Sequence, residues 1–169
     1  METYPLDCIP AGAVDLVGGK ALGLNALARA GLAIPAGFVA VGPFAPRDAD
    51  LLWRRVCRQQ LAPVAVRSSA DREDGRELSF AGQFYTGLRL TGKKAFRRAF
   101  GRCLAPDKAP SGYAREFAAQ PGRPAGLVPR TVAAPQAGLP FTVRPAADPP
   151  LAIQAVSRAG DGPDAPQAP

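Results

Sequence analysis

A glycine pair and a lysine open the clearest helical pattern of the chain, in the stretch GGKALGLNALARAG, residues 18–31. After Lys20, leucine and alanine recur at the spacing that places them on one face of a helix. Gly31 stands where a helix commonly ends on a glycine in the left-handed conformation. The stretch therefore predicts a helix over residues 20–30, preceded by a short lead over residues 1–19 that ends in a turn.

Outward from this helix, short apolar runs alternate with amphipathic stretches. The sequence predicts strands over 38–41, 64–66, 84–90, 127–128, 141–143 and 151–156. It predicts further helices over 49–60, 93–104 and 111–119, with Asp48 as the cap of the first. Residues 160–169 have no apolar anchor and are predicted to form a disordered tail rich in proline and alanine.

The composition restricts the chemistry. Apolar residues make up 47% and charged residues 21%, as in a globular protein, whereas 18 Gly and 19 Pro indicate extensive loops. The chain has no histidine, which excludes a histidine triad, a histidine-ligated metal and a phosphohistidine within these residues. Cys8, Cys57 and Cys103 form no C-x-x-C pair, so reduced thiols and a cytoplasmic location are expected. Neither a leader peptide nor a membrane span is predicted.

The positive charge is concentrated in one region. The net charge is +7, and residues 89–130 hold ten Lys or Arg against only Asp107 and Glu116. One interpretation is a surface that binds nucleic acid or another polyanion. The simpler interpretation is a solvated basic face, because the aromatic residues of the region are spaced as the apolar sides of helices, namely Phe96, Phe100, Tyr113 and Phe117. We therefore do not expect nucleic acid as a partner.

Two short motifs have the chemistry of phosphate binding. In the first, Gly18 and Gly19 allow backbone N–H groups to approach an anion at a helix start, and Lys20 adds a positive charge. In the second, Arg67 and Ser68 follow the apolar run of residues 64–66, where a guanidinium group can bind phosphate with two hydrogen bonds. Each motif also has a structural explanation, as a turn with a solvated lysine and as a surface arginine paired with nearby acids.

A third motif, SFAGQ at residues 79–83, is a loop of mainly small residues that contains one glycine. Such a loop can cover the phosphates of a nucleotide through its main-chain N–H groups. By itself it fits a turn at a strand edge equally well.

The three motifs in this order resemble the nucleotide-binding domain of the pyruvate phosphate dikinase and phosphoenolpyruvate synthase family. The first block of similarity runs over residues 18–39, the second over residues 64–83, and the third is AGLPFTVRP at residues 137–145. The resemblance implies an α+β, ATP-grasp-like fold that holds MgATP, here as a truncated domain over residues 1–159. In that family a phosphoryl group passes from ATP to a histidine on a separate domain. The resemblance thus implies a partner chain or domain that carries the histidine and the phosphate acceptor.

The resemblance also implies roles for individual residues. Lys20 and Arg67 are expected to act on the ATP phosphates as the catalytic cations. The expected nucleotide contacts are Gly18, Gly19, Lys20, Arg67, Ser68, Ser79, Ala81, Gly82, Gln83 and Thr142. Asp161 is the candidate ligand of Mg²⁺, because it takes the place of an acidic residue of the family.

The sequence departs from the family pattern at several positions. The regions between the blocks are short, Pro129 replaces a glutamine in the expected adenine-binding strand, and Arg144 and Gln154 replace polar or acidic residues. A proline at Pro129 also removes a backbone donor. These departures leave open a second hypothesis, in which the chain is a degenerate relative that binds nucleotide weakly or not at all.

Overall fold

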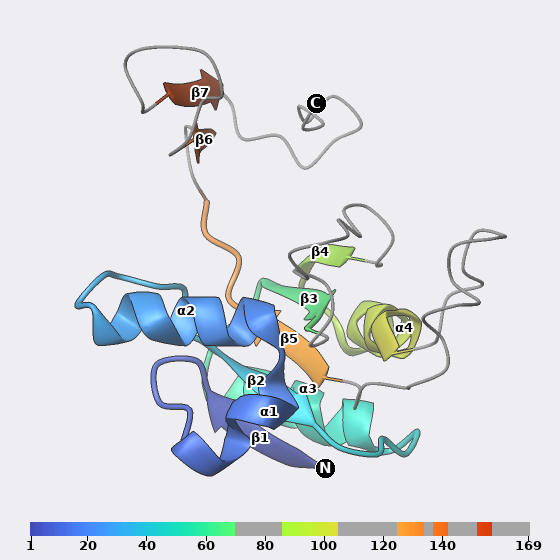
Figure 1. The fold of residues 1–169 in the computed structure, drawn as a ribbon. Helices are drawn as coiled ribbons and strands as arrows, with labels where there is room; N and C mark the ends of the chain where they lie inside the picture. The colour runs from blue at the N-terminus through green and yellow to red at the C-terminus, as the bar shows by residue number, and fades with distance from the viewer. Residues whose placement is uncertain (70–85, 105–124, 134–136, 142–151, 157–169) are drawn as a thin grey trace, which may run out of the picture. The chain divides into compact units, whose positions relative to one another are not determined.

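The computed structural model describes residues 1–69, 86–104, 125–133, 137–141 and 152–156 of the 169-residue chain. These residues fall into two units, within 1–131 and within 132–169, which are described separately. The first unit contains a five-stranded sheet with helices, and the second contains a strand pair (Figure 1).

The sheet of the first unit is antiparallel at every pairing, in the order β1-β2-β5-β3-β4. Its strands are β1 (Glu2–Pro5), β2 (Gly37–Val41), β3 (Val64–Ser68), β4 (Thr86–Leu90) and β5 (Ala125–Pro129). The helices are η1 (Ala11–Ala13), α1 (Val14–Val17), α2 (Gly19–Arg29), α3 (Asp48–Arg58) and α4 (Lys93–Leu104). The described residues thus confirm an α+β domain, whereas they do not establish the ATP-grasp arrangement specifically.

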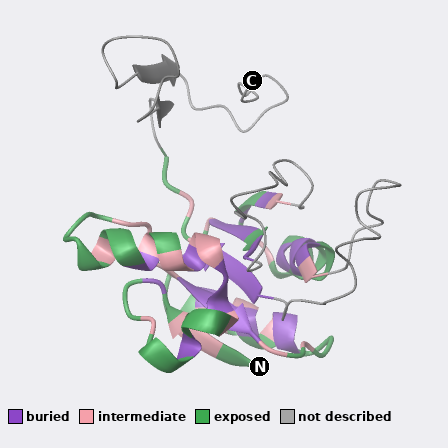
Figure 2. Ribbon diagram, viewed as in Figure 1, coloured by how far each residue is buried: buried purple, intermediate pink, exposed green. Residues whose placement is uncertain are grey.

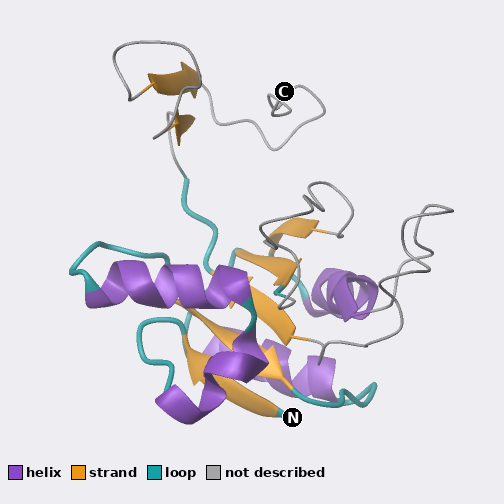
Figure 3. Ribbon diagram, viewed as in Figure 1, coloured by secondary structure: helices purple, strands orange, loops and turns teal. Residues whose placement is uncertain are grey.

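Helices cover both faces of this sheet (Figure 3). Phe38 of β2 and Val128 of β5 pack in the core cluster that includes the buried side chains of α3 and α4. Val39 and Leu127, one residue away on each strand, pack in a second cluster with side chains of α1 and α2. Because successive side chains of a strand point to opposite faces, β2 and β5 supply both cores. They are buried along most of their length (Figure 2).

The N-terminal segment is more ordered than the sequence predicts. The predicted lead over residues 1–19 contains β1, η1 and α1. β1 pairs with β2 from Glu2 opposite Val41 to Pro5 opposite Phe38. Its burial is only partial, so the strand has no alternating apolar pattern that could be recognised in the sequence.

The predicted cap of α3 is also wrong in detail. Arg47 occupies the N-cap position, and no side chain makes a capping hydrogen bond there. Asp48 is the first residue of the helix, and its Oδ2 accepts a hydrogen bond of 2.7 Å from the Ala45 N–H. The carboxylate therefore closes the turn that precedes the helix, and its charge still lies at the favourable helix end.

Arg55 of α3 connects this helix to the sheet. Its guanidinium donates a hydrogen bond to Thr3 Oγ1 of β1 and lies 4.6 Å from the centre of the Phe38 ring. Burial lowers the pKa of the Arg55 guanidinium, and the positive charge of Arg58 lowers that pKa further. At the surface of β1, the hydrogen bond that Tyr4 donates to Glu2 raises the pKa of the tyrosine.

Helices α2 and α3 end in the same motif with different residues. At the end of α2, Gly31 has φ +79° and Leu32 N–H donates to Leu27 O at 3.0 Å, as predicted for a glycine cap. At the end of α3, Leu61 N–H donates to Val56 O at 3.0 Å, but the left-handed residue is Gln60, at φ +51°.

We expect Gln60→Gly to stabilise the protein. A side chain in the left-handed region costs about 1–2 kcal/mol, and the greater freedom of glycine in the unfolded chain offsets part of that cost. The expected gain in the free energy of unfolding is about 0.5–1 kcal/mol, measured by urea denaturation. Gly31→Ala, at the equivalent position of α2, is the reciprocal control and should lose a similar amount. A loss in both variants would contradict the strain at Gln60.

The second unit is an antiparallel pair of β6 (Ala137–Phe141) and β7 (Ala152–Val156). Ala137 lies opposite Val156, and Phe141 lies opposite Ala152. β7 confirms the predicted last strand, whereas β6 begins earlier than the predicted strand at 141–143. The predicted helix over 111–119 and the predicted tail lie outside the described residues.

Candidate functional site

The turn before α2 requires glycine for two reasons. Gly18 is buried and has φ +74° and ψ 163°, a conformation that side chains rarely adopt. A Cβ atom at this position would lie 2.0 Å from the Ser69 carbonyl oxygen and 2.4 Å from the Ser69 carbonyl carbon. The backbone of the turn therefore lies so close to the segment after β3 that only glycine fits at this position.

Ser69 holds this turn through its hydroxyl group. The Oγ donates to Val17 O at 2.7 Å and accepts from Ala21 N–H at 3.2 Å. The Ser69 N–H donates to Ala125 O of β5 at 2.9 Å. The glycine turn and the end of β3 are therefore connected directly, although they lie about 48 residues apart in the sequence.

The two predicted cations lie next to this contact between the glycine turn and the end of β3: Lys20 is in the first turn of α2, and Arg67 is near the end of β3. Lys20 is half-buried, and its Nζ lies 3.5 Å from the Ser68 carbonyl oxygen. Arg67 is exposed and pairs across the sheet with Leu127, which packs in the cluster with α1 and α2. Residues directly opposite one another share a face, so Arg67 projects on the face that α2 covers. The structure thus places Lys20 and Arg67 on the same side of the sheet.

Ser68 contributes its main chain to this side. Because side chains alternate along a strand, the Ser68 side chain points to the opposite face from that of Arg67. Its partner Gly126 confirms the assignment, since a Cβ at Gly126 would meet the Phe100 ring of α4 at 2.7 Å. The carbonyl oxygen of Ser68, rather than its hydroxyl, is the group that lies near Lys20.

Sequence reasoning did not single out Ser69 as a site residue. The sequence feature that points to it is the serine pair that follows Arg67. Because side chains alternate along a strand, Ser69 lies on the same side as Arg67, and Ser68 lies on the other side. Ser69 is 1% exposed, and its contact with the glycine turn depends on a tertiary approach that no local pattern encodes.

Several predicted site residues lie outside the described residues, namely Ser79, Ala81, Gly82, Gln83, Thr142 and Asp161. Their roles stay predictions. Within the described ranges, no group of three or more His, Cys, Asp or Glu side chains is arranged to hold a metal ion. The described residues around the glycine turn therefore do not by themselves form a Mg²⁺ site.

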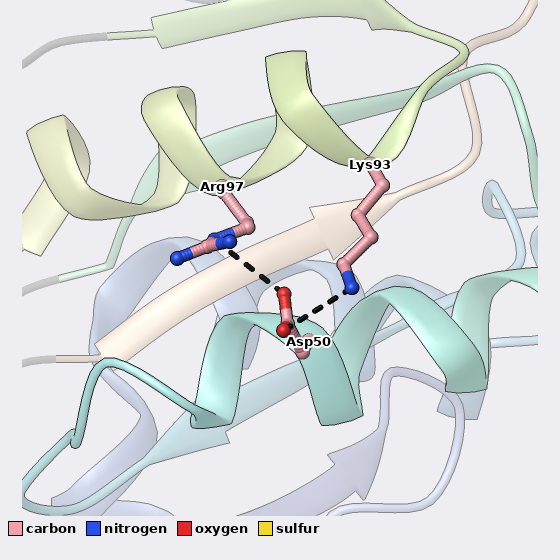
Figure 4. Close-up of polar contacts among 3 residues, drawn as sticks. All are labelled: Asp50, Lys93 and Arg97. Atoms are coloured by element: carbon pink, nitrogen blue, oxygen red, sulfur yellow. Dashed lines mark ion pairs between the residues drawn. The ribbon is translucent and has the colours of Figure 1, made fainter.

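The basic region is partly described, in β4 and α4. Lys93, Lys94, Arg97 and Arg98 of α4 line a shallow depression at the surface. Two of them also pair with Asp50 of α3: Lys93 Nζ lies 3.2 Å from Oδ2, and Arg97 Nε lies 3.4 Å from Oδ1 (Figure 4). The aromatic residues of this helix are buried, with Phe96 0% and Phe100 3% exposed. The predicted apolar face of a helix is thus confirmed for these two rings, whereas Tyr113 and Phe117 lie outside the described residues.

The amino-acid sequence matches a family of nucleotide-binding domains. The family model described as pyruvate phosphate dikinase, AMP/ATP-binding domain, matches residues 50–149, more than half of the chain. The chain belongs to this family. The match includes the end of β3, with Arg67 and Ser69, and begins after the glycine turn. Membership in a family of AMP/ATP-binding domains supports a nucleotide-binding role.

One curated relative is similar as well. The prodigiosin synthesizing transferase PigC of Serratia marcescens is 32% identical in an alignment 163 residues long, and the alignment covers 76% of this chain and 18% of PigC. The chain thus spans less than a fifth of the length of this relative. In the described part of the chain, no helix has both the length and the apolar character that crossing a bilayer requires.

Proposed function

We propose that this chain binds the phosphates of ATP where the start of α2 meets the end of β3. The observation that carries the proposal is the Gly18–Ser69 contact, which joins two motifs that each suit phosphate and places their cations on one face. The first turn of α2 offers N–H groups and a positive helix end, Lys20 a compact charge and Arg67 a planar fork of donors. Membership in a family of AMP/ATP-binding domains supports a nucleotide as the source of the phosphates.

We propose that ATP bound here serves a phosphotransferase of the phosphoenolpyruvate synthase type, which passes a phosphoryl group to a histidine. The 169 residues contain no histidine, so the acceptor lies elsewhere in the same protein or on another chain. The residues described here act by binding and neutralising phosphate oxygens, which is the main protein contribution to phosphoryl transfer. Mg²⁺ would be held by the nucleotide and by residues outside those described, with Asp161 as our candidate.

A thermal melt with ATP and Mg²⁺ tests the phosphate site. A ligand that binds only the folded state raises the melting temperature, by an amount equivalent to about 2.7 kcal/mol at 100 times Kd. We expect wild type to show this rise, and Lys20→Ala and Arg67→Ala each to weaken binding roughly 10- to 100-fold, because a hydrogen bond to a charged group contributes about 1.5–3 kcal/mol.

Arg29→Ala is the matched control, because Arg29 is an exposed cation at the far end of the same helix as Lys20. It should retain the wild-type response. Equal losses in all three variants would indicate attraction by net charge alone. A wild-type melt unaffected by ATP would favour the second hypothesis, a degenerate relative without nucleotide binding.

A further inference from the structure

The helical segment around Gly18 is broken, and the break leaves polar backbone groups without partners inside either helix. α1 ends at Val17 and α2 begins at Gly19, with Gly18 between them outside helical geometry. A helix end leaves its last carbonyl groups and its first N–H groups without partners inside the helix. Serine, threonine or aspartate commonly supplies the missing partner from the N-cap position. Gly18 is the N-cap of α2 and has no side chain to do so.

The Ser69 hydroxyl supplies these partners from a distant part of the chain. It accepts the N–H of Ala21, the third residue of α2, which is the group that an N-cap serine would bind. It also donates to the carbonyl of Val17, the last residue of α1. One hydroxyl thus caps both helices at the break, from a position fixed to β5 through the Ser69 N–H.

The consequence concerns the two cations of the proposed phosphate site. Ala21 directly follows Lys20, and Ser69 lies two residues after Arg67, so the hydroxyl joins the two backbones next to the charged residues. The hydroxyl therefore holds the start of α2 at the end of β3, together with the close backbone contact between Gly18 and Ser69.

We propose that Ser69 is a positioning residue, which sets the start of α2 and Lys20 against Arg67 for binding of the ATP phosphates. The inference rests on the proposed function, because it concerns the same site. Ser69 itself is only 1% exposed, so it does not contact ATP directly. It acts through its hydrogen bonds to the backbone of Val17 and Ala21.

Titration of the folded chain with ATP and Mg²⁺, at a temperature where every variant is folded, tests the role of Ser69. We expect Ser69→Ala to weaken ATP binding roughly 10-fold. We also expect faster hydrogen exchange of the Ala21 amide, because its acceptor is removed. Ser69→Thr, which keeps the hydroxyl, should retain more affinity than Ser69→Ala.

The matched control is Asn25→Ala. Asn25 is a buried polar residue on the same helix, and its Nδ2 donates to Leu6 O at 3.0 Å, away from both cations. This variant should lower the melting temperature but leave the ATP affinity within about twofold of wild type. If Ser69→Ala does not fold, Ser69→Cys replaces it, because the thiol keeps the volume and is a weaker hydrogen-bonding group.

The outcomes separate the two claims. ATP affinity in Ser69→Ala equal to wild type, or lowered equally in Asn25→Ala, would overturn the positioning role and leave the proposed function intact. Absence of ATP binding by the wild-type chain would overturn both. A selective loss in Ser69→Ala, with partial recovery in Ser69→Thr, would support the role.

Discussion

Gly18→Ala is expected to lower the free energy of unfolding by about 3–5 kcal/mol, a large share of the stability of a small domain. Two costs combine. The backbone of Gly18, at φ +74° and ψ 163°, lies in a region that is nearly restricted to glycine. The new methyl group would also lie 2.0 Å from the Ser69 carbonyl oxygen, a backbone atom that cannot rotate away. Relief requires the turn to separate from β3, which removes both hydrogen bonds of the Ser69 hydroxyl.

Urea denaturation of Gly18→Ala, with Gly23→Ala as the control, measures this cost. Gly23 is an exposed residue inside α2, and a Cβ there would meet no atom within 4 Å. Alanine at that position should stabilise the helix by up to about 1 kcal/mol, since glycine is a poor helix former. The same chemical change five residues apart is thus predicted to have opposite signs. A loss below about 1 kcal/mol in Gly18→Ala would show that the turn adjusts easily and that the close contact is not structurally required.

The local elements of the fold could largely be predicted from the sequence. α4 spans Lys93–Leu104, as predicted, because its buried residues recur at helical spacing. The end of α2 was predicted from Gly31, whose conformational freedom is a property of the residue itself. β1 was missed because its stability comes from pairing with β2, a contact between residues distant in the sequence.

The long-range organisation could not be predicted from local patterns. β5 lies between β2 and β3, so strands far apart in the sequence are neighbours in the sheet. The site has the same character. Local chemistry makes Lys20 and Arg67 each a plausible phosphate ligand, but in the sequence only the family resemblance links the two residues. The contact that joins them, between Gly18 and Ser69, depends on a backbone approach and a buried hydroxyl that leave no periodic signal.

Phe96→Ala is expected to be the most destabilising change in the basic region, with a loss of about 3–5 kcal/mol in the free energy of unfolding. The ring is 0% exposed and packs against two other aromatic side chains. Its centre is 5.4 Å from that of Trp53 in α3 and 5.8 Å from that of Phe100 in α4. Truncation leaves a cavity between α3 and α4, and the rings around it cannot fill the space without leaving their own packing.

Lys94→Ala provides the control on the same helix. Lys94 is exposed two residues before Phe96, and its removal should change the stability by no more than about 0.5 kcal/mol.

The Phe96→Ala and Lys94→Ala variants also distinguish the two interpretations of this region. If α4 served to bind nucleic acid through stacked aromatic rings, Phe96→Ala would reduce polyanion binding in a protein of normal stability. Because the ring is buried against Trp53, we expect instead that Phe96→Ala strongly lowers the stability of the protein. Any polyanion binding should then depend on cations such as Lys94 and decrease steeply as the salt concentration rises. A fully stable Phe96→Ala variant would contradict the packing and reopen the polyanion interpretation.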